Sequence, residues 1–180
     1  KVTGVQTCAL PICAGRRWSR RLAPWSVDSV DGRGLPVRAG GVYLFTGGLG
    51  DVGFALATSL AEHAGAGATL VLAGRTELPP RDRWESLLGS GGLEAPAARR
   101  LRRALELEGT GATVWTPAVD VGDPSACRAL VASIVERFGR LDGVVHAAGV
   151  LRDGLVCAKS RGDWEALLSA KVAGTWGLDR

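Results

Sequence analysis

The amino-acid sequence predicts a doubly wound α/β fold, in which a parallel sheet lies between helices. Three observations predict it. Short apolar strand runs alternate with helical stretches four times after residue 39. A glycine-rich turn joins the first strand run to the first helical stretch. Asp123-Pro124 marks a helix start, because an aspartate caps a helix and a proline fits its first position.

The first strand, residues 42–45, is an apolar run that ends at a glycine turn. A helix follows, because Val52, Leu56 and Leu60 recur at helical spacing. Residues 69–73 form the second strand run, which also ends at a glycine.

Residues 76–95 are rich in proline, glycine and charge, which predicts a loop with a short helical piece near residues 84–88. The next helix is expected at residues 97–108, because two glycines follow and end it. The third strand is expected at residues 112–117.

The helix that begins at Asp123 carries an apolar stripe of Leu130, Val131, Ile134, Val135 and Phe138. Gly139 ends this helix. Residues 141–146 form the fourth strand, and a last helix is expected from about Asp163 to the end of the chain.

Composition excludes several classes of protein. The 180 residues are 46% hydrophobic, which suits one domain with a core and excludes a disordered chain. No apolar run reaches the roughly 18–20 residues of a membrane helix. The four cysteines form no CxxC pair and lie away from both histidines, so neither a metal site nor a disulfide framework is expected, and a cytoplasmic location fits.

The net charge of +4 comes from the N-terminal segment. Residues 1–39 hold seven basic and two acidic residues, whereas residues 40–180 hold 15 basic and 16 acidic residues. The arginines at residues 16–21 are interpreted as part of a solvated linker, and a nucleic-acid surface is the less favoured alternative.

The start of the chain has an unusual origin. Residues 2–12 match the translation of a sequencing-library adapter, so residues 1–12 are interpreted as an artefact. The sequence contains no methionine and begins with Lys1, which predicts a processed, trimmed or fragmentary chain. Residues 13–39 show no sustained period and are interpreted as a linker.

The turn Thr46-Gly47-Gly48-Leu49-Gly50-Asp51-Val52-Gly53 lies between a predicted strand and a predicted helix. Glycines let the backbone approach a pyrophosphate, which then lies at the helix N-terminus. The pattern therefore predicts dinucleotide binding, with a purely structural turn as the alternative. Asp51 suits a helix N-terminus, although its carboxylate would repel a phosphate. Arg75, after the second strand, favours NADPH over NADH.

The sequence resembles the short-chain dehydrogenase/reductase superfamily at three places: the glycine turn, Asp120-Val121 after the third strand, and His146-Ala147-Ala148-Gly149 after the fourth. The resemblance implies a Rossmann-like sheet. It also implies that the Asp120-Val121 pair contacts the adenine and that Ala147, Ala148 and Gly149 lie beside the cofactor. His146 itself is interpreted as a structural histidine at a strand end.

More closely, residues 40–180 resemble the ketoreductase domain of modular polyketide synthases. The signatures are residues 40–50, 71–75, 146–153 and 168–175. The resemblance implies NADPH-dependent reduction of a β-ketoacyl thioester held on an acyl carrier protein, within a multidomain polyketide synthase. It also implies that residues 13–39 join an upstream structural subdomain to the NADPH-binding part of the catalytic domain.

Lys171 is the predicted catalytic residue of this chain. It falls on the expected apolar stripe of the last helix, where a lysine is costly unless it is paired or functional; a snorkelling lysine is the alternative. In polyketide ketoreductases a lysine stands on this helix, where ordinary short-chain reductases have asparagine. The resemblance implies that Lys171 binds the nicotinamide ribose and lowers the pKa of a tyrosine acid.

The serine and tyrosine of the family lie downstream of the lysine helix, so they are expected beyond Arg180, together with the later strands of the sheet. The 180 residues alone are therefore expected to be inactive. Leu151-Arg152-Asp153 resembles the stereochemical motif of B-type ketoreductases, in which Asp153 would be the diagnostic residue. A discrete short-chain reductase and a non-catalytic cofactor-binding module are the alternative functions.

Overall fold

The computed structural model describes residues 12–17, 37–65 and 67–179, and it divides the chain into two units, Lys1–Leu35 and Pro36–Arg180. Most of the expected adapter segment and linker lies outside the described residues. In the first unit, β1 (Ile12–Cys13) pairs antiparallel with β2 (Arg16–Arg17). Ala14 and Gly15 between them both have positive φ, as the type I′ form of a two-residue hairpin turn requires.

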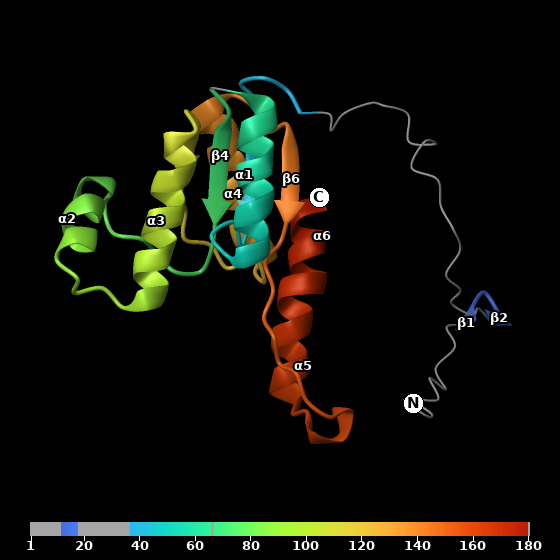
Figure 1. Cartoon of the computed structure of the whole chain (residues 1–180). Helices are drawn as coiled ribbons and strands as arrows, with labels where there is room; N and C mark the ends of the chain where they lie inside the picture. The colour runs from blue at the N-terminus through green and yellow to red at the C-terminus, as the bar shows by residue number, and fades with distance from the viewer. Residues whose placement is uncertain (1–11, 18–36, 66, 180) are drawn as a thin grey trace, which may run out of the picture. The chain divides into compact units, whose positions relative to one another are not determined.

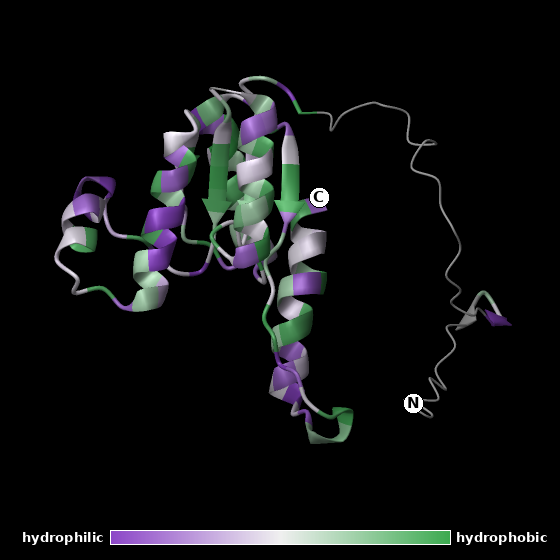
Figure 2. Ribbon diagram, viewed as in Figure 1, coloured by the Kyte–Doolittle hydropathy of each residue, from purple (hydrophilic) through white to green (hydrophobic). Residues whose placement is uncertain are grey.

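The second unit contains the predicted parallel sheet. Its strands are β3 (Val42–Thr46), β4 (Thr69–Ala73), β5 (Thr113–Trp115) and β6 (Gly143–His146). They pair in the order β5-β4-β3-β6, all parallel, and Figure 2 shows β4 as hydrophobic. The chain moves outward from β3 to β5 and then returns to the other side of β3, so the strand order reverses between β3 and β6.

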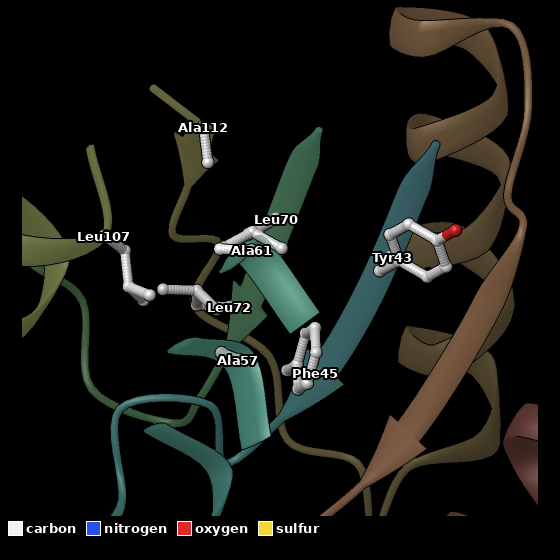
Figure 3. Close-up of a cluster of buried hydrophobic side chains, with 8 residues drawn as sticks. All are labelled: Tyr43, Phe45, Ala57, Ala61, Leu70, Leu72, Leu107 and Ala112. Carbon is white, nitrogen blue, oxygen red and sulfur yellow. The ribbon is translucent and has the colours of Figure 1, made fainter. Parts of the chain in front are cut away.

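One face of the sheet is covered by α1 (Asp51–Ala64) and α3 (Ala95–Gly109), as Figure 1 shows for α1. Figure 3 shows the cluster that joins them to the sheet: Tyr43, Phe45, Ala57, Ala61, Leu70, Leu72, Leu107 and Ala112. The buried side of α1 consists of glycine and alanine, whereas Val52 remains 68% exposed. The helical spacing is confirmed, but small residues, which allow close approach, form the buried side.

The other face packs against α4 (Pro124–Phe138), whose Leu130 and Ile134 are fully buried against β3 and β4. Both ends of α4 are as predicted. The Asp123 carboxylate accepts a hydrogen bond from the Ser125 N–H, and Gly139 adopts the left-handed conformation that ends a helix. Helix α6 (Gly174–Asp179) packs beside α4.

The loop between β4 and α3 contains the expected helical piece. The 3₁₀ turn η2 (Arg81–Arg83) leads into α2 (Trp84–Gly89), and the Trp84 indole N–H donates to the Pro79 carbonyl at 2.7 Å. Trp84 packs with Leu101 and Ala104 of α3 in a small separate core. Strand β5 is shorter than residues 112–117, although one parallel bridge joins Gly74 to Ala118 beyond its end.

The last helix is divided. A 3₁₀ turn, η3 (Val156–Ala158), precedes α5 (Arg161–Leu168), the π-helical turn η4 (Ser169–Ala173) and then α6. Helix α5 begins earlier than predicted, because Ser160 and Asp163 form a reciprocal capping box. Among residues 12–17, 37–65 and 67–179, no helix combines the length and apolar character of a membrane span.

Most of the apolar stripe expected on the last helix is exposed. Trp164, Leu168 and Val172 are all more than 40% exposed, and Lys171 is exposed as well. The buried positions are instead Gly174 and Gly177, which lie close to α4 and to the end of β6. Glycines allow the helix to approach its neighbours. Leu178 is the stripe residue that packs against the buried cluster of β3, β4 and α4, whereas Trp164, Leu168 and Val172 remain exposed.

Candidate functional site

A cleft of about 470 Å³ lies at the carboxyl ends of the strands. Segments that follow β3, β4, β5 and β6 line it, together with parts of α3, α5 and η4. Ligand sites of doubly wound sheets lie at this edge, where the strand order reverses. Nine of the predicted site residues line the cleft: Gly47, Leu49, Gly50, Arg75, Asp120, Val121, Ala147, Ala148 and Gly149.

The glycine-rich turn is tightly packed against its own helix and against the segment after β6. Gly47 has a φ of 68°, and a methyl group there would lie 2.9 Å from the Ala148 Cα atom. A methyl group at Gly53, the last glycine of the turn, would lie 2.3 Å from the Gly47 carbonyl oxygen. Gly50 caps α1 without a side-chain hydrogen bond. The turn therefore presents backbone rather than side chains to the cleft, at a helix N-terminus.

Asp51 is paired with a basic residue that the sequence did not single out. The Arg103 guanidinium of α3 contacts the Asp51 carboxylate at 2.6 Å and donates to the Leu49 carbonyl at 2.8 Å. Its guanidinium carbon also lies 4.9 Å from the centre of the Phe54 ring. The hydrogen bond and charge of Arg103, with a smaller effect of Arg99, hold the pKa of Asp51 below its usual value. The repulsion expected between Asp51 and a phosphate is thus opposed locally.

Three arginines line the cleft. Arg75 lies after β4, as the sequence predicted, separated from the strand by Gly74, and it is exposed at the cleft. Arg99 and Arg100 come from the N-terminal half of α3. The run of arginines on α3 is visible in the sequence, but only the packing of α3 beside α1 shows which of them reach this edge. These arginines give the cleft positive charge suited to an anionic group.

The turn after β5 is ordered by its own side chains. The Asp120 carboxylate accepts a hydrogen bond from the Gly122 N–H at 2.9 Å and remains exposed at the cleft. Val121 is buried, and its carbonyl accepts a hydrogen bond from the Cys127 thiol at 3.4 Å. Burial raises the pKa of this thiol, which makes Cys127 a structural residue rather than a nucleophile.

The segment after β6 is connected to the glycine turn by Thr46, which is fully buried. The Thr46 hydroxyl lies 2.6 Å from His146 Nδ1 and 3.4 Å from the Ala148 backbone nitrogen. The other ring nitrogen of His146, Nε2, lies 2.8 Å from the carbonyl oxygen of Ala170 in η4. Both nitrogens of His146 therefore have partners, which agrees with the structural role expected for it.

Lys171 lies in η4, and its side chain extends along the segment after β6. A methyl group at Gly149 would lie 3.0 Å from Lys171 Cε and 3.5 Å from Nζ. The expectation of a buried lysine was wrong, because the helix turns its glycines to the protein and leaves Lys171 exposed. The amine nevertheless lies beside one of the predicted cofactor-binding residues.

Some predicted residues do not line the cleft. Asp153 lies in an exposed loop, next to Arg152, whose guanidinium is 3.8 Å from the Asp163 carboxylate. Val52 is mostly exposed. Gly48 is buried beneath the turn. Ser169, which no sequence signal indicated, lines the cleft from η4.

The single tyrosine of the sequence is remote from this site. Tyr43 lies near the start of β3, buried in the core, whereas the cleft lies beyond the end of that strand. Its hydroxyl accepts a hydrogen bond from the Arg38 N–H at 2.6 Å and lies 3.3 Å from the Arg38 carbonyl. Tyr43 is therefore a structural residue.

Comparison with known proteins gives consistent matches. Residues 41–180 match the KR domain family. A 6-methylsalicylic acid synthase of Aspergillus terreus is 40% identical over 137 residues, which cover 73% of this chain and 7% of that protein. Polyketide synthase PksN of Bacillus subtilis is 30% identical over 163 residues, which cover 89% of this chain and 3% of that protein. The chain thus spans a small part of these relatives.

Solved structures show the same fold. The crystal structure of a ketoreductase domain from the bacillaene assembly line is 33% identical, with a TM-score of 0.66. The match covers 83% of this chain and 31% of that chain. The parallel sheet with helices on both faces is thus the architecture that this structure shares with the solved domain, of which it spans a part.

Proposed function

The chain belongs to the KR domain family, and from this premise we propose that it forms the NADPH-binding part of a ketoreductase that acts in polyketide biosynthesis. The parent protein would reduce a β-ketoacyl thioester, carried by an acyl carrier protein, to the β-hydroxyacyl thioester. One observation carries the proposal: a single cleft unites the glycine turn, Arg75 and the segment against which Lys171 lies.

The glycine turn fits a pyrophosphate. Its surface is backbone, at the N-terminus of the long helix α1, and side chains at Gly47 or Gly53 would collide with neighbouring backbone. Unpaired N–H groups and the helix dipole both favour an anion at such a place. Arg103 offsets the one carboxylate in the turn, so the turn retains its preference for an anion.

Arg75 fits the 2′-phosphate that distinguishes NADPH from NADH. It stands at the end of β4, the position from which a doubly wound site contacts the adenosine ribose. Arg99 and Arg100 also line the cleft and add positive charge, whereas Asp120 is the acidic residue of the cleft lining among the described residues. A guanidinium can donate two parallel hydrogen bonds to a phosphate, whereas a ribose hydroxyl lacks the charge that makes them strong.

The position of Lys171 supports a role beside the nicotinamide half of the cofactor. Its amine lies near Gly149 in the segment after β6, whereas Arg75 follows β4, on the other side of β3. When bound, NADPH would supply the hydride for reduction of the β-keto carbon. The ammonium of Lys171 would hold the ribose and favour the ionised form of a nearby tyrosine. Asp153 would belong to the substrate side, where it would influence the stereochemistry of the product.

The 180 residues contain no tyrosine that could act as the general acid, because Tyr43 is buried in the core and engaged by Arg38. We therefore expect this chain to bind NADPH without turnover. The tyrosine and serine would come from another part of the parent protein. Measurable NADPH-dependent reduction of a β-ketoacyl thioester by the 180-residue chain would contradict this expectation.

The experiment that tests the proposal is a titration of the chain with NADPH and NADH, followed by nicotinamide fluorescence. The wild-type chain should bind NADPH more tightly. Arg75→Ala should lose about tenfold in NADPH affinity, the effect of roughly 1.4 kcal/mol from one charge-assisted contact, and little in NADH affinity. Arg137→Ala is the matched control, because Arg137 is exposed and stacks on Trp115 and Phe138, away from the cleft. Tighter binding of NADH, or equal effects of both substitutions, would refute the NADPH assignment.

A further inference from the structure

His146 joins three segments that are far apart in the sequence. Its ring lies between Thr46, at the end of β3, and Ala170, in the π-helical turn η4. The ring is also closely surrounded: a methyl group at Gly174 would lie 3.2 Å from His146 Cε1 and 3.3 Å from Nε2. The histidine therefore occupies a fixed space between the sheet and the last helix.

The direction of the hydrogen bonds follows from the chemistry of the partners. A carbonyl oxygen only accepts, so Nε2 donates to Ala170. The other nitrogen of a neutral imidazole is an acceptor, so Nδ1 accepts from the Thr46 hydroxyl. The Thr46 oxygen in turn can accept the longer hydrogen bond from the Ala148 N–H. A directed chain thus runs from the segment after β6, through Thr46 and His146, to η4.

The carbonyl that His146 holds belongs to the peptide group whose nitrogen is that of Lys171. Because this group is planar, a hydrogen bond to its oxygen restrains the orientation of the backbone at Lys171. The helix is irregular at this point: the Gly174 N–H donates to the Ser169 carbonyl, five residues earlier. A π-helical turn is an uncommon local conformation, so it needs partners outside the helix to persist.

We propose that His146 is a positioning residue, which through its hydrogen bond to the Ala170 carbonyl holds η4 so that the Lys171 amine lies against Gly149. This inference rests on the proposed function, because the position of Lys171 matters only if the cleft holds the cofactor. It assigns His146 a role in the nicotinamide half of the site and none in the adenosine half, which Arg75 and Asp120 border.

Three substitutions separate positioning from simple space filling. The amide nitrogen of glutamine can occupy the place of histidine Nε2, so His146→Gln keeps a donor for Ala170. The shorter side chain of asparagine reaches only the place of Nδ1, so His146→Asn keeps a contact with Thr46 alone. His146→Phe keeps the ring volume and loses both hydrogen bonds. Positioning through Ala170 predicts that only the glutamine variant resembles the wild type.

Two ligands distinguish the halves of the site. NADPH would contact both halves, whereas 2′,5′-ADP carries only the adenosine half. His146→Asn and His146→Phe should weaken NADPH binding by about tenfold, the loss of one charge-assisted contact of Lys171, and should leave 2′,5′-ADP binding unchanged. His146→Gln should bind both ligands as the wild type does. A general loss of structure would weaken both ligands, so the ratio of the two affinities is the informative quantity.

The position of Lys171 can also be measured without any ligand. The sequence has three lysines, Lys1, Lys159 and Lys171, so reductive ¹³C-methylation gives few NMR signals. The Lys171 signal is identified by its loss in Lys171→Arg. In the free chain it should keep its wild-type shift in His146→Gln and move in the asparagine and phenylalanine variants. Lys159, whose ammonium lies over the Trp164 ring, is the internal control and should not move.

The outcomes for the two proposals differ. If the wild-type chain binds neither NADPH nor 2′,5′-ADP, the proposed function fails, and the Lys171 signal of the free variants alone decides the role of His146. The positioning role is overturned if Lys171 keeps its signal in all three variants. It is also overturned if the asparagine and phenylalanine variants keep the wild-type ratio of affinities, or if glutamine fails to restore it.

Discussion

Gly53→Ala places a methyl group at a crowded point of the glycine-rich turn. The new carbon would lie 2.3 Å from the Gly47 carbonyl oxygen and 2.9 Å from the Gly48 Cα atom, and both are backbone atoms. Real contacts of this kind are no shorter than 3.0 Å, so the turn must move by at least 0.7 Å. Because Gly47 lines the cleft, this displacement changes the surface that the pyrophosphate would contact.

The expected magnitude combines two opposing effects. Overpacking costs about 1–3 kcal/mol in free energy of unfolding. Alanine in place of glycine within a helix returns about 1 kcal/mol. The net loss of stability is therefore about 0–2 kcal/mol, a modest fall in melting temperature of roughly 2–4 °C per kcal/mol. NADPH affinity should fall by about tenfold or more, because backbone displacement removes several contacts at once.

Gly109→Ala is the matched control, since Gly109 ends helix α3 and has no atom within 4 Å of the new methyl position. This variant should gain up to about 1 kcal/mol in stability and bind NADPH as the wild type does. Thermal unfolding and nicotinamide fluorescence measure both quantities. If Gly53→Ala is as stable as Gly109→Ala and keeps wild-type affinity, the constraint that Gly53 imposes on the turn is refuted.

Three further predictions concern charge and cysteine chemistry. Asp51→Ala should raise NADPH affinity several-fold, and Arg103→Ala should lower it, when the affinities are measured at low and at high salt. If both substitutions changed the affinity in the same direction, the pairing of Asp51 with Arg103 would be contradicted. Hydrogen bonds hold the pKa of Asp142 in the folded chain below its value in the unfolded chain. The stability that ionised Asp142 contributes to the folded chain is therefore complete above the unfolded pKa, and it is lost as the pH falls through the folded pKa. Melting temperatures below about pH 4 should therefore fall less steeply in Asp142→Asn, and an unchanged slope would contradict this. In the native chain a maleimide should modify the exposed Cys157 and spare the buried Cys127, as peptide mass spectrometry would show; rapid labelling of Cys127 would contradict its burial.

The strands, their parallel arrangement and the ends of α4 could be predicted from the sequence, because each depends on residues that are close along the chain. The run of residues 69–73 is apolar after Thr69 and buried at every position, as strands covered on both faces are. Asp123 and Gly139 act on their own helix ends. The glycine turn was placed at the cleft for the same reason, since its conformation is decided by its own residues.

The environment of Lys171 could not be predicted in this way. The apolar stripe rule assumes that the large residues of a helix face the protein. Here Gly174 and Gly177 make the close contact, and Leu168 is left 51% exposed. The irregular turn that carries Lys171 also has no local sequence signal, because its partner His146 lies 24 residues before Ala170.

The pairing of the Asp51 carboxylate with Arg103 could not be predicted from the sequence either. Arg103 lies 52 residues away, and several arginines of α3 were equal candidates before the fold was known. The Arg103 side chain is only 17% exposed, and its guanidinium also contacts the turn through the Leu49 carbonyl. Pairings of this kind depend on how two helices lie beside each other, which single-sequence patterns do not describe.

The place of β6 in the sheet has a consequence for the way this chain folds. The hydrogen bond between Thr46 and His146 joins residues 100 positions apart, whereas β3, β4 and β5 follow one another in sequence. Closing such a long loop costs chain entropy before any stabilising contact forms, so we expect β6 to pair with β3 late in folding. Until β6 pairs with β3, the segment after β6 cannot line the cleft. During refolding, the ability to bind the ligand would therefore appear only when β6 has paired with β3. A cofactor present during refolding would stabilise the chains in which this pairing has already formed.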